Sequence, residues 1–332
     1  MTAVDYSKFP DSTPSRFAVV YVLRSSDFKK ETTVKSFVSD ESLSIDTVCD
    51  IFPSANWAER EAYDQYGVIF LNHPNLKRVL NHKQFIGHPL RKDYKITQGQ
   101  ICTETEDLMD EMLPLLKSKG YTDEEIADLM LLNVGPSHPA SHGTIRNFVA
   151  LEGETIAACV TEIGYLHRGF EKACEHHTYS QVIPYTDRLN YCSAILNNIG
   201  WAKAIEDMMK IEITPRAKMI RVVIGELSRI IDHFVCNAAN MVDLGGLTSL
   251  WYLFGARDQA YDLLSKLTGA RLTNTYTRIG GLEFDLYDGF EKDLEEVLKT
   301  SEKAIEDVLS LIAHNKLFHD RTQDIGVIKA DF

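Results

Sequence analysis

Two histidines four residues apart stand in the most unusual segment of this 332-residue chain, residues 135–143, whose sequence is GPSHPASHG. At that spacing on a helix, His138 and His142 would lie on one face and could bind a metal ion. The prolines and glycines oppose a helix, so we expect a tight loop between strands. The simpler interpretation is a turn whose histidines cap backbone carbonyls. The alternative is a loop at a functional site, where imidazole donates hydrogen bonds and carries protons near pH 7.

A second cluster occupies residues 164–172, with the sequence GYLHRGFEK, and combines fixed charges with two glycines. A surface ion-pair turn is the simplest interpretation of these charges, Arg168 among them, although a backbone turn beside a partner would have the same composition. A lone acid, Asp243, precedes a Gly-Gly pair at the end of an apolar helical pattern. An aspartate in that position is usually a turn residue.

The third cluster, residues 185–191 (YTDRLNY), places a phenol close to charged side chains. On a helix, Asp187 and Tyr191 would be four residues apart and would share a face, with Arg188 between them in sequence. A phenol with a pKa of about 10 can donate a proton to a strongly basic anion. The simpler interpretation of Tyr191 is a half-buried aromatic side chain. Spacing alone does not join these clusters into one pocket.

Motifs for several other chemistries are absent. The sequence contains no GxGxxG, GxxxxGK[ST], HExxH, GxSxG or CxxC pattern, and its six cysteines are scattered. We therefore expect reduced thiols, no metal site, and no iron–sulfur cluster held by this chain alone. The net charge of −13 disfavours nucleic acid as a partner. No apolar run approaches the ~18 residues of a membrane span, and the first residues do not resemble a signal peptide.

The elements that would position these clusters begin with an α+β pattern. Residues 17–23 and 32–37 are rich in β-branched and aromatic side chains, which predicts strands. Residues 56–66 are predicted to form a helix that stops at Gly67. The stretch that follows is dense in Asn, His, Pro and Gly, so we expect an extended tail with turns up to Tyr94.

An acidic linker is expected at residues 95–128. Residues 103–107 (TETED) would open a helix that ends near Gly120, and Thr122 and Glu125 would form a capping box at the start of the next turn. The density of acidic residues suggests that this segment is a solvated connector.

The remainder of the chain begins with two candidate strands, residues 129–134 and 148–151, and is expected to be helical thereafter. Apolar spacing and terminal residues predict long helices that start at Pro215, at about 249 and at about 289.

The predicted fold class is therefore an α+β N-terminal domain followed by a mainly α-helical domain with a small β element at its start. The predicted divisions are residues 1–94, the linker at 95–128, and residues 129–332.

Taken together, the clusters closely resemble motifs of the quinone-site (D) subunit of respiratory complex I, the proton-pumping NADH:quinone oxidoreductase. That subunit is distantly similar to the large subunit of [NiFe] hydrogenases. Five motifs match in order, which makes the resemblance specific from residue 129 onward. They are GPSHPASHG at 135–143, GYLHRGFEK at 164–172, YTDRLNY at 185–191, DLG at 243–245 and DRTQDIG at 320–326.

The first part of the chain resembles the C subunit of the same complex. The matching stretches are EREAYDQYG at 59–67 and GHPLRKDY at 87–94. The two subunits occur fused in some bacteria, so the chain is identified as a member of the fused C/D family, with the expected linker as the fusion joint. The resemblance also implies further sequence at both ends, so we expect the chain to be truncated and its second domain to be incomplete.

The resemblance implies a role for each matching residue. His142 would hydrogen-bond one carbonyl of a quinone, and Tyr191 would bond the other and supply a proton. Asp243 would pair with His142 and favour its charged form. The resemblance implies that His138, Asp187 and Arg188 bind the quinone or lie near its site.

Two positions are implied to lie near an iron–sulfur cluster held by the partner B subunit. Arg168 would raise the cluster's potential through its fixed charge. Thr273 stands where family members often have a histidine, and threonine does not titrate near pH 7. We therefore expect a cluster potential that depends less on pH than in relatives with histidine.

The resemblance implies an enzyme subunit that is active only within its complex. Quinone would be the substrate, and the partners would be the iron–sulfur B subunit, other peripheral-arm subunits and membrane-arm subunits. The implied location is the cytoplasmic face of the bacterial inner membrane, as a peripheral protein. The quinone type and the electron donor stay open.

Two alternatives compete with this interpretation. A hydrogenase-like enzyme would need CxxC pairs to hold its metals, and this sequence has none. A non-catalytic fragment or assembly protein of the same complex would be expected to lose His142, Tyr191 or Asp243, and all three are present. The expected truncation favours the non-catalytic alternative.

Overall fold

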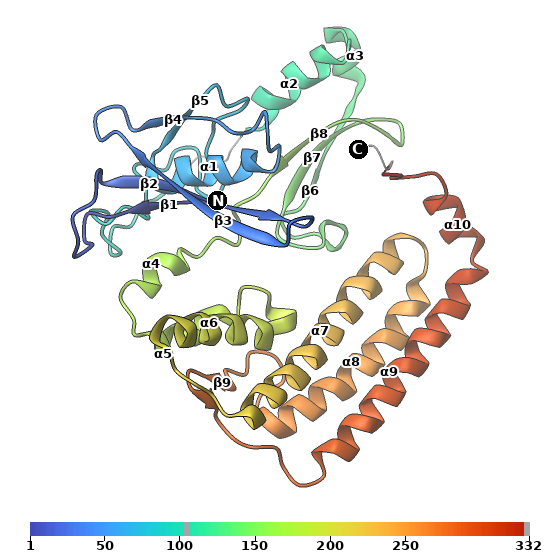
Figure 1. The fold of residues 1–332 in the computed structure, drawn as a ribbon. Coiled ribbons are helices and arrows are strands. Elements are labelled where there is room, and N and C mark those ends of the chain that lie inside the picture. The colour runs from blue at the N-terminus through green and yellow to red at the C-terminus, as the bar shows by residue number, and fades with distance from the viewer. Residues whose placement is uncertain (103–106, 329–332) are drawn as a thin grey trace. The chain divides into compact units, whose positions relative to one another are not determined.

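The structure, a computed structural model, describes residues 1–102 and 107–328 (Figure 1). The chain divides into two compact units, unit 1 (Met1–Glu175) and unit 2 (His176–Phe332). Unit 1 takes in residues 1–94, the described part of the expected linker, and the start of the segment predicted to be helical. The compact units therefore group the residues differently from the predicted domains.

The first sheet of unit 1 is antiparallel and has the strand order β1 (Thr2–Asp5), β2 (Phe17–Ser25), β3 (Lys30–Val38). The two strands predicted from composition are confirmed. Helix α1 (Ala55–Tyr66) contacts this sheet and ends at Gly67, whose φ of 77° is the expected left-handed stop. The core of this part contains Ala3, Phe17, Val19, Val38, Ala62, Val68 and Phe70.

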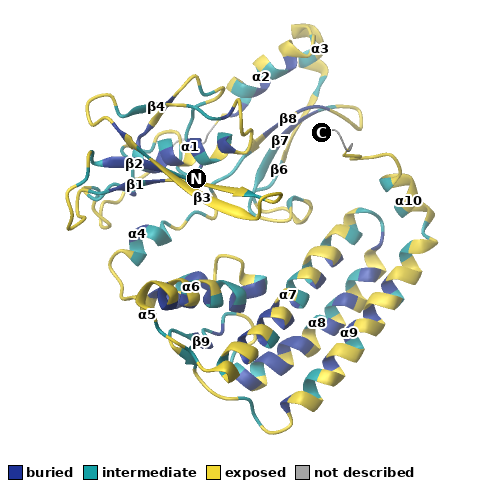
Figure 2. Cartoon of the chain, viewed as in Figure 1, coloured by how far each residue is buried: buried dark blue, intermediate teal, exposed yellow. Residues whose placement is uncertain are grey.

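A short parallel pair and a long irregular stretch complete this half of unit 1. Strand β4 (Ser44–Asp46) pairs with β5 (Ile69–Leu71). Residues 72–102 then contain turns and no regular element, which confirms the expected tail. Figure 2 shows buried positions on both α1 and β2.

A second antiparallel sheet follows in unit 1, in the order β6 (Met130–Val134), β7 (Arg146–Glu152), β8 (Thr155–Glu162). The strands predicted around residues 129–134 and 148–151 are confirmed. Strand β8 was missed, because the segment was expected to be helical. The strand pairs with β7, and Ala157, Ala158 and Val160 lie in the core of this sheet.

Helix α2 (Met109–Ser118) packs on this second sheet and shares a core with β8. Met112 and Leu116 are 0% exposed. The expectation of a solvated connector is therefore wrong for this helix, because acidic residues on one face concealed an apolar face on the other. The acidic start at 103–106 lies outside the described residues. The capping box of Thr122 and Glu125 is confirmed at α3 (Asp123–Asp128).

Unit 1 ends with the short helix α4 (Phe170–Cys174), and unit 2 begins with α5 (Tyr179–Thr186) and α6 (Ala194–Met209). Three long helices then lie side by side (Figure 1): α7 (Pro215–Asp243), α8 (Leu247–Thr268) and α9 (Phe290–Ala313). All three were predicted. The short helix α10 (Lys316–Thr322) follows.

The long helices begin and end where their terminal residues predict. The Thr214 hydroxyl accepts a hydrogen bond from the Ala217 amide (3.2 Å) and caps α7. Gly269, with φ of 83°, ends α8. One apolar core joins α7, α8 and α9, and includes Ile224, Leu227, Ile231, Leu263, Leu264, Leu267 and Val297.

A buried ion pair ties a small hairpin to this bundle. Strands β9 (Thr277–Arg278) and β10 (Gly281–Leu282) form the hairpin. Arg221 on α7 donates two hydrogen bonds to Glu206 on α6, at 2.8 and 2.7 Å, and a third to the Gly281 carbonyl at 3.0 Å. The Gly280 amide donates to Glu206 Oε1 at 2.8 Å. Among the described residues, no helix combines the length and the apolar composition that a bilayer span requires.

Candidate functional site

The GPSHPASHG segment forms the connection between β6 and β7, where the register runs to Val134 opposite Asn147. The expected tight loop is confirmed, with a short 3₁₀ turn at Pro139–Ser141 and a bridge between His138 and Gly143. Gly135 has φ of 97°, and a Cβ there would lie 1.9 Å from the Ile145 carbonyl oxygen. Only glycine fits that position, so the loop leaves β6 in a fixed direction.

Both histidines of the loop are exposed, and each is held by local contacts. His138 Nδ1 accepts a hydrogen bond from the Ala140 amide (3.2 Å), so this ring caps an amide rather than the expected carbonyl. His142 has the left-handed φ of 50°, and its amide donates to the Pro139 carbonyl (3.3 Å). The Ser141 hydroxyl bridges the His138 and Gly143 carbonyls. His142 therefore occupies an exposed position on a well-braced turn.

The GYLHRGFEK segment of unit 1 is anchored to the tail that precedes the linker. A Cβ at Gly164 would lie 2.6 Å from the Leu80 carbonyl oxygen, which requires glycine at this approach. Lys172 is buried and its Nζ donates to the Arg91 carbonyl (2.7 Å), so the segment is more than a surface ion-pair turn. Arg168 lies between these two anchors and is exposed.

The third cluster does not form the continuous helix that would place Asp187 and Tyr191 on one face. Helix α5 ends at Thr186, residues 187–190 turn, and Tyr191 begins a separate 3₁₀ turn, Tyr191–Ser193. Tyr191 is 54% exposed, whereas Asp187 is 0% exposed. The expectation of a shared face is wrong, because Asn190 has non-helical dihedral angles and interrupts the helix.

Asp187 is buried, and the Asn198 side chain and the Thr275 backbone lie close to its carboxylate. Neither carboxylate oxygen of Asp187 forms a hydrogen bond with a described residue, and the Asn198 amide donates instead to the Thr186 hydroxyl (2.9 Å). Burial raises the pKa of Asp187, and the nearby Asn198 side chain and Thr275 backbone offset that effect only in part. This burial favours an internal role over direct contact with a ligand.

Tyr191 and Asp243 lie at different levels of α7. Beside Tyr191, the Asn190 side chain donates to Ser193 (2.7 Å) and to Asp232 on α7 (3.2 Å), which holds the turn against that helix. Asp243 is the last residue of α7, eleven positions beyond Asp232. At 1.5 Å per residue, Asp232 and Asp243 are separated by about 16 Å along the axis of α7.

The other predicted residues of unit 2 differ in exposure and in their contacts. Asp243 is exposed, and its carbonyl accepts a hydrogen bond from Arg321 on α10 (2.7 Å). Arg188 is exposed and donates to the Pro184 carbonyl (2.7 Å). Thr273 is half-buried in the loop between α8 and β9. Unit 1 thus carries His138, His142 and Arg168, and unit 2 carries the other five predicted residues.

Sequence reasoning missed a buried polar cluster of Cys49, Glu59 and His73 that has metal-ligand chemistry. Glu59 accepts hydrogen bonds from the Thr47 hydroxyl (2.5 Å) and from Cys49 Sγ (3.4 Å). His73 Nδ1 accepts from the Asn75 amide (2.9 Å), so the proton is on Nε2, which faces the Asn56 carbonyl at 3.1 Å. Both ring nitrogens are in use, and the cluster therefore serves as an internal hydrogen-bond network. The glutamate of the EREAYDQYG stretch was the available signal.

Comparisons with known proteins relate both parts of the chain to one enzyme. The family model described as respiratory-chain NADH dehydrogenase, 30 Kd subunit, matches residues 1–100, and the one described as the 49 Kd subunit matches residues 243–332. These matches explain why the chain combines an α+β start with long helices.

Curated relatives match almost the whole chain. A protein of Bdellovibrio bacteriovorus, named as the C/D subunit of NADH-quinone oxidoreductase, is 46% identical over 96% of this chain and 56% of its own length. Proteins of the same name from Proteus mirabilis and Acidiphilium cryptum are 37% and 35% identical, over 94% and 98% of this chain. The chain spans a little over half the length of these relatives, at 53% to 57%.

Proposed function

Because this chain belongs to the family of fused C/D subunits of NADH-quinone oxidoreductase, we propose that it supplies side chains to the quinone-reduction site of that enzyme. The observation that carries the proposal is the exposure of His142, Tyr191 and Asp243 on braced supports. Each offers the proton chemistry that quinone reduction needs. The alternative nearby acid, Asp187, is enclosed in the core and is assigned no contact with quinone.

Reduction of a quinone to a quinol adds two electrons and two protons to its two carbonyl oxygens. In the proposed mechanism the Tyr191 phenol donates a hydrogen bond, and then a proton, to one oxygen. His142 donates to the other oxygen through its imidazole. Both groups stabilise negative charge as it develops on the oxygens, which lowers the barrier to electron arrival.

Asp243 is proposed to act on His142 rather than on the quinone. A carboxylate favours the charged imidazolium, so the loss of a proton from His142 would change the interactions of Asp243. This assignment agrees with the ~16 Å that separates Asp243 from Asp232, the partner of Asn190, along α7. The change at Asp243 is the proposed link between reduction and proton translocation.

Electrons are proposed to come from an iron–sulfur cluster on the partner B subunit, near Arg168 and Thr273. The exposed guanidinium of Arg168 would raise the cluster potential. His138 and Arg188 are proposed to border the quinone as polar neighbours. The proposed setting is the peripheral arm at the cytoplasmic face of the bacterial inner membrane, with other arm subunits as partners.

The proposal is tested with Tyr191→Phe in the complete protein, assembled in its native membranes. We expect the variant to lower inhibitor-sensitive quinone reduction by about tenfold or more, because a proton donor is lost. NADH oxidation with an artificial acceptor that bypasses quinone should be unchanged. Tyr252→Phe, at another half-exposed tyrosine of unit 2, is the matched control.

A pull-down of the 332-residue chain from native membranes separates the enzyme from the alternative. Co-purification of an iron–sulfur subunit, with quinone reduction lost in Tyr191→Phe, supports the proposal. Co-purification with undiminished reduction in Tyr191→Phe, or recovery of the chain alone, would favour a non-catalytic assembly protein or fragment.

A further inference from the structure

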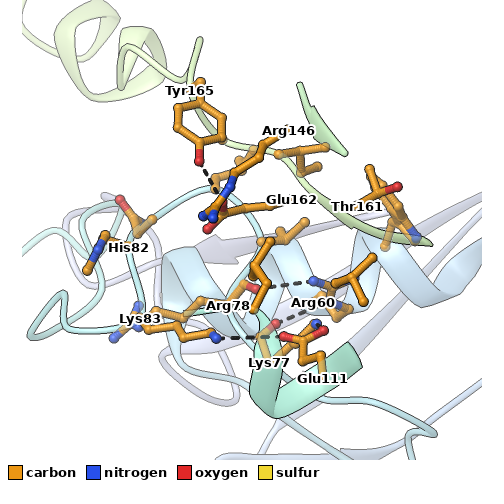
Figure 3. A pocket seen from close by; sticks show the side chains of 18 residues that line it. Arg60, Lys77, Arg78, His82, Lys83, Glu111, Arg146, Thr161, Glu162 and Tyr165 are labelled. Carbon is orange, nitrogen blue, oxygen red and sulfur yellow. Dashed lines mark hydrogen bonds and ion pairs between the residues drawn. The ribbon is translucent and has the colours of Figure 1, made fainter. Parts of the chain in front are cut away.

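A cavity of about 350 Å³ lies within unit 1 (Figure 3). Its walls come from α1, from residues 77–83, from the start of α2 and from β7 and β8. Cavities of this size commonly hold small ligands. None of the residues assigned to quinone reduction lines it.

The charged side chains of the cavity are predominantly cationic, although the whole chain carries a net charge of −13. Figure 3 shows these side chains converging from several elements. The lining contains two carboxylates, Glu111 and Glu162, and five cations, Arg60, Lys77, Arg78, Lys83 and Arg146. A concave surface with this excess attracts anions.

The segment that carries most of these cations is held rigidly by one buried acid. Asp64, at 0% exposure, accepts hydrogen bonds from the amides of Val79, Leu80 and Asn81, at 3.1, 2.8 and 2.8 Å. It also accepts from Arg78 Nη1 at 2.6 Å, so the charge of Arg78 is matched. The wall is therefore preorganised before any ligand arrives.

Arg60 forms no direct ion pair with a described residue, although the charges of Glu111 and Asp64 act on it. The residue is 9% exposed, and its guanidinium donates only to the backbone carbonyls of Lys77 (3.3 Å) and Arg78 (3.2 Å). Across residues 1–102 and 107–328, no carboxylate lies within 4.0 Å of its nitrogens, and Nη1 makes no hydrogen bond. Burial lowers the pKa of Arg60, and the charges of Glu111 and Asp64 offset that effect only in part.

We propose that this cavity binds an oxyanion, a phosphate or carboxylate group, between Arg60 and Lys77. The planar fork of a guanidinium suits two-point binding of either group. Lys77 pairs with Glu111 across the cavity and is about one-third exposed, so it can turn toward a ligand. Trp57, whose ring lies 5.6 Å from the Arg60 guanidinium, and Val79 offer apolar wall for the body of a larger ligand.

The experiment is calorimetric titration of the full chain with inorganic phosphate and, separately, with malonate, at constant ionic strength. We expect at least one to bind, and Arg60→Gln to weaken that binding by about tenfold, the typical loss of a charge-assisted contact. Lys77→Gln, at a more exposed position, should weaken it by about threefold or more and keeps the test valid if Arg60→Gln fails to fold. Lys30→Gln, an exposed cation on β3, is the control for net charge.

Binding of phosphate alone would identify a phosphate group as the natural ligand, and binding of malonate alone would identify a carboxylate. Binding of both supports a general oxyanion site. The proposal is overturned if neither anion binds below about 50 mM. It is equally overturned if Lys30→Gln weakens binding as much as the cavity variants do.

Discussion

Arg221 and Glu206 are each 6% exposed at the side chain, and their two-point pair is a charged contact inside an apolar bundle. We predict that Arg221→Met lowers the free energy of unfolding by about 3–5 kcal/mol, because it leaves the Glu206 carboxylate buried without its cation. Chemical denaturation monitored by circular dichroism measures this. Arg229→Met, which breaks an exposed pair on the same helix, should change stability little. Equal effects of the two substitutions would contradict the argument.

Asp187 is a buried carboxyl group whose charged form is unfavourable in the folded protein, unlike the paired charge of Arg221. Its folded pKa is raised by burial, so its contribution to stability is present at low pH and is lost as pH rises through the folded pKa. Asp187→Asn removes the titrating group. The stability of this variant relative to the native protein should therefore become more favourable between about pH 4 and pH 8. Denaturant unfolding across that range tests this, with exposed Asp288→Asn as control. If the difference in stability between the two proteins does not change with pH, the pKa of Asp187 is not raised in the folded protein.

At the scale of single residues, the sequence predicted which side chains carry chemistry better than where they point. Asp187 and Tyr191 are four residues apart, but the turn after Thr186 buries one and exposes the other. In that turn, the Asn190 side chain contacts Asp232, forty-two positions away. The spacing of Asp187 and Tyr191 in the sequence holds no information about such a contact. The expectation that they share a helical face therefore could not have been checked from local spacing.

At the scale of an element, the buried apolar face of helix α2 is expected to contribute to the stability of the protein. We predict that Leu116→Ala costs about 2–5 kcal/mol of stability, because the side chain is 0% exposed in the core shared with β8. Thermal or chemical unfolding measures the loss. Lys117→Ala, one position further and exposed, should have little effect. A neutral Leu116→Ala would instead indicate that this helix is a solvated connector.

Elements with strong terminal signals were predicted closely, and elements defined by pairing were not. Thr214–Pro215 and Gly269 mark helix ends through local backbone preferences, and the structure confirms them. Strand β8 depends on its pairing with β7, from Arg146 opposite Glu162 to Glu152 opposite Thr155. Its own residues do not distinguish a strand from a buried helix segment. The cationic cavity was also invisible, because its walls come from five separated stretches of chain.

For the whole molecule, the division into two compact units predicts separable unfolding. We expect two thermal transitions in calorimetry of the full chain. Leu116→Ala should lower the midpoint of one transition, and Arg221→Met should lower the midpoint of the other. Because each substitution lies in the core of a different unit, a common shift of both transitions would show that the chain unfolds as one cooperative body.

The contacts of Lys172 with the Arg91 carbonyl and of Gly164 with Leu80 join the segment that matches the 30 Kd subunit model to residues beyond that match, within one unit. Between separate polypeptides, such a junction would have to form by collision at cellular concentrations. On one chain the tether supplies a local concentration that can reach the millimolar range. Translation also fixes the ratio of the two parts at one to one. Individually weak contacts at this junction are therefore sufficient, and substitutions that would separate two free subunits can be tolerated in a fused one.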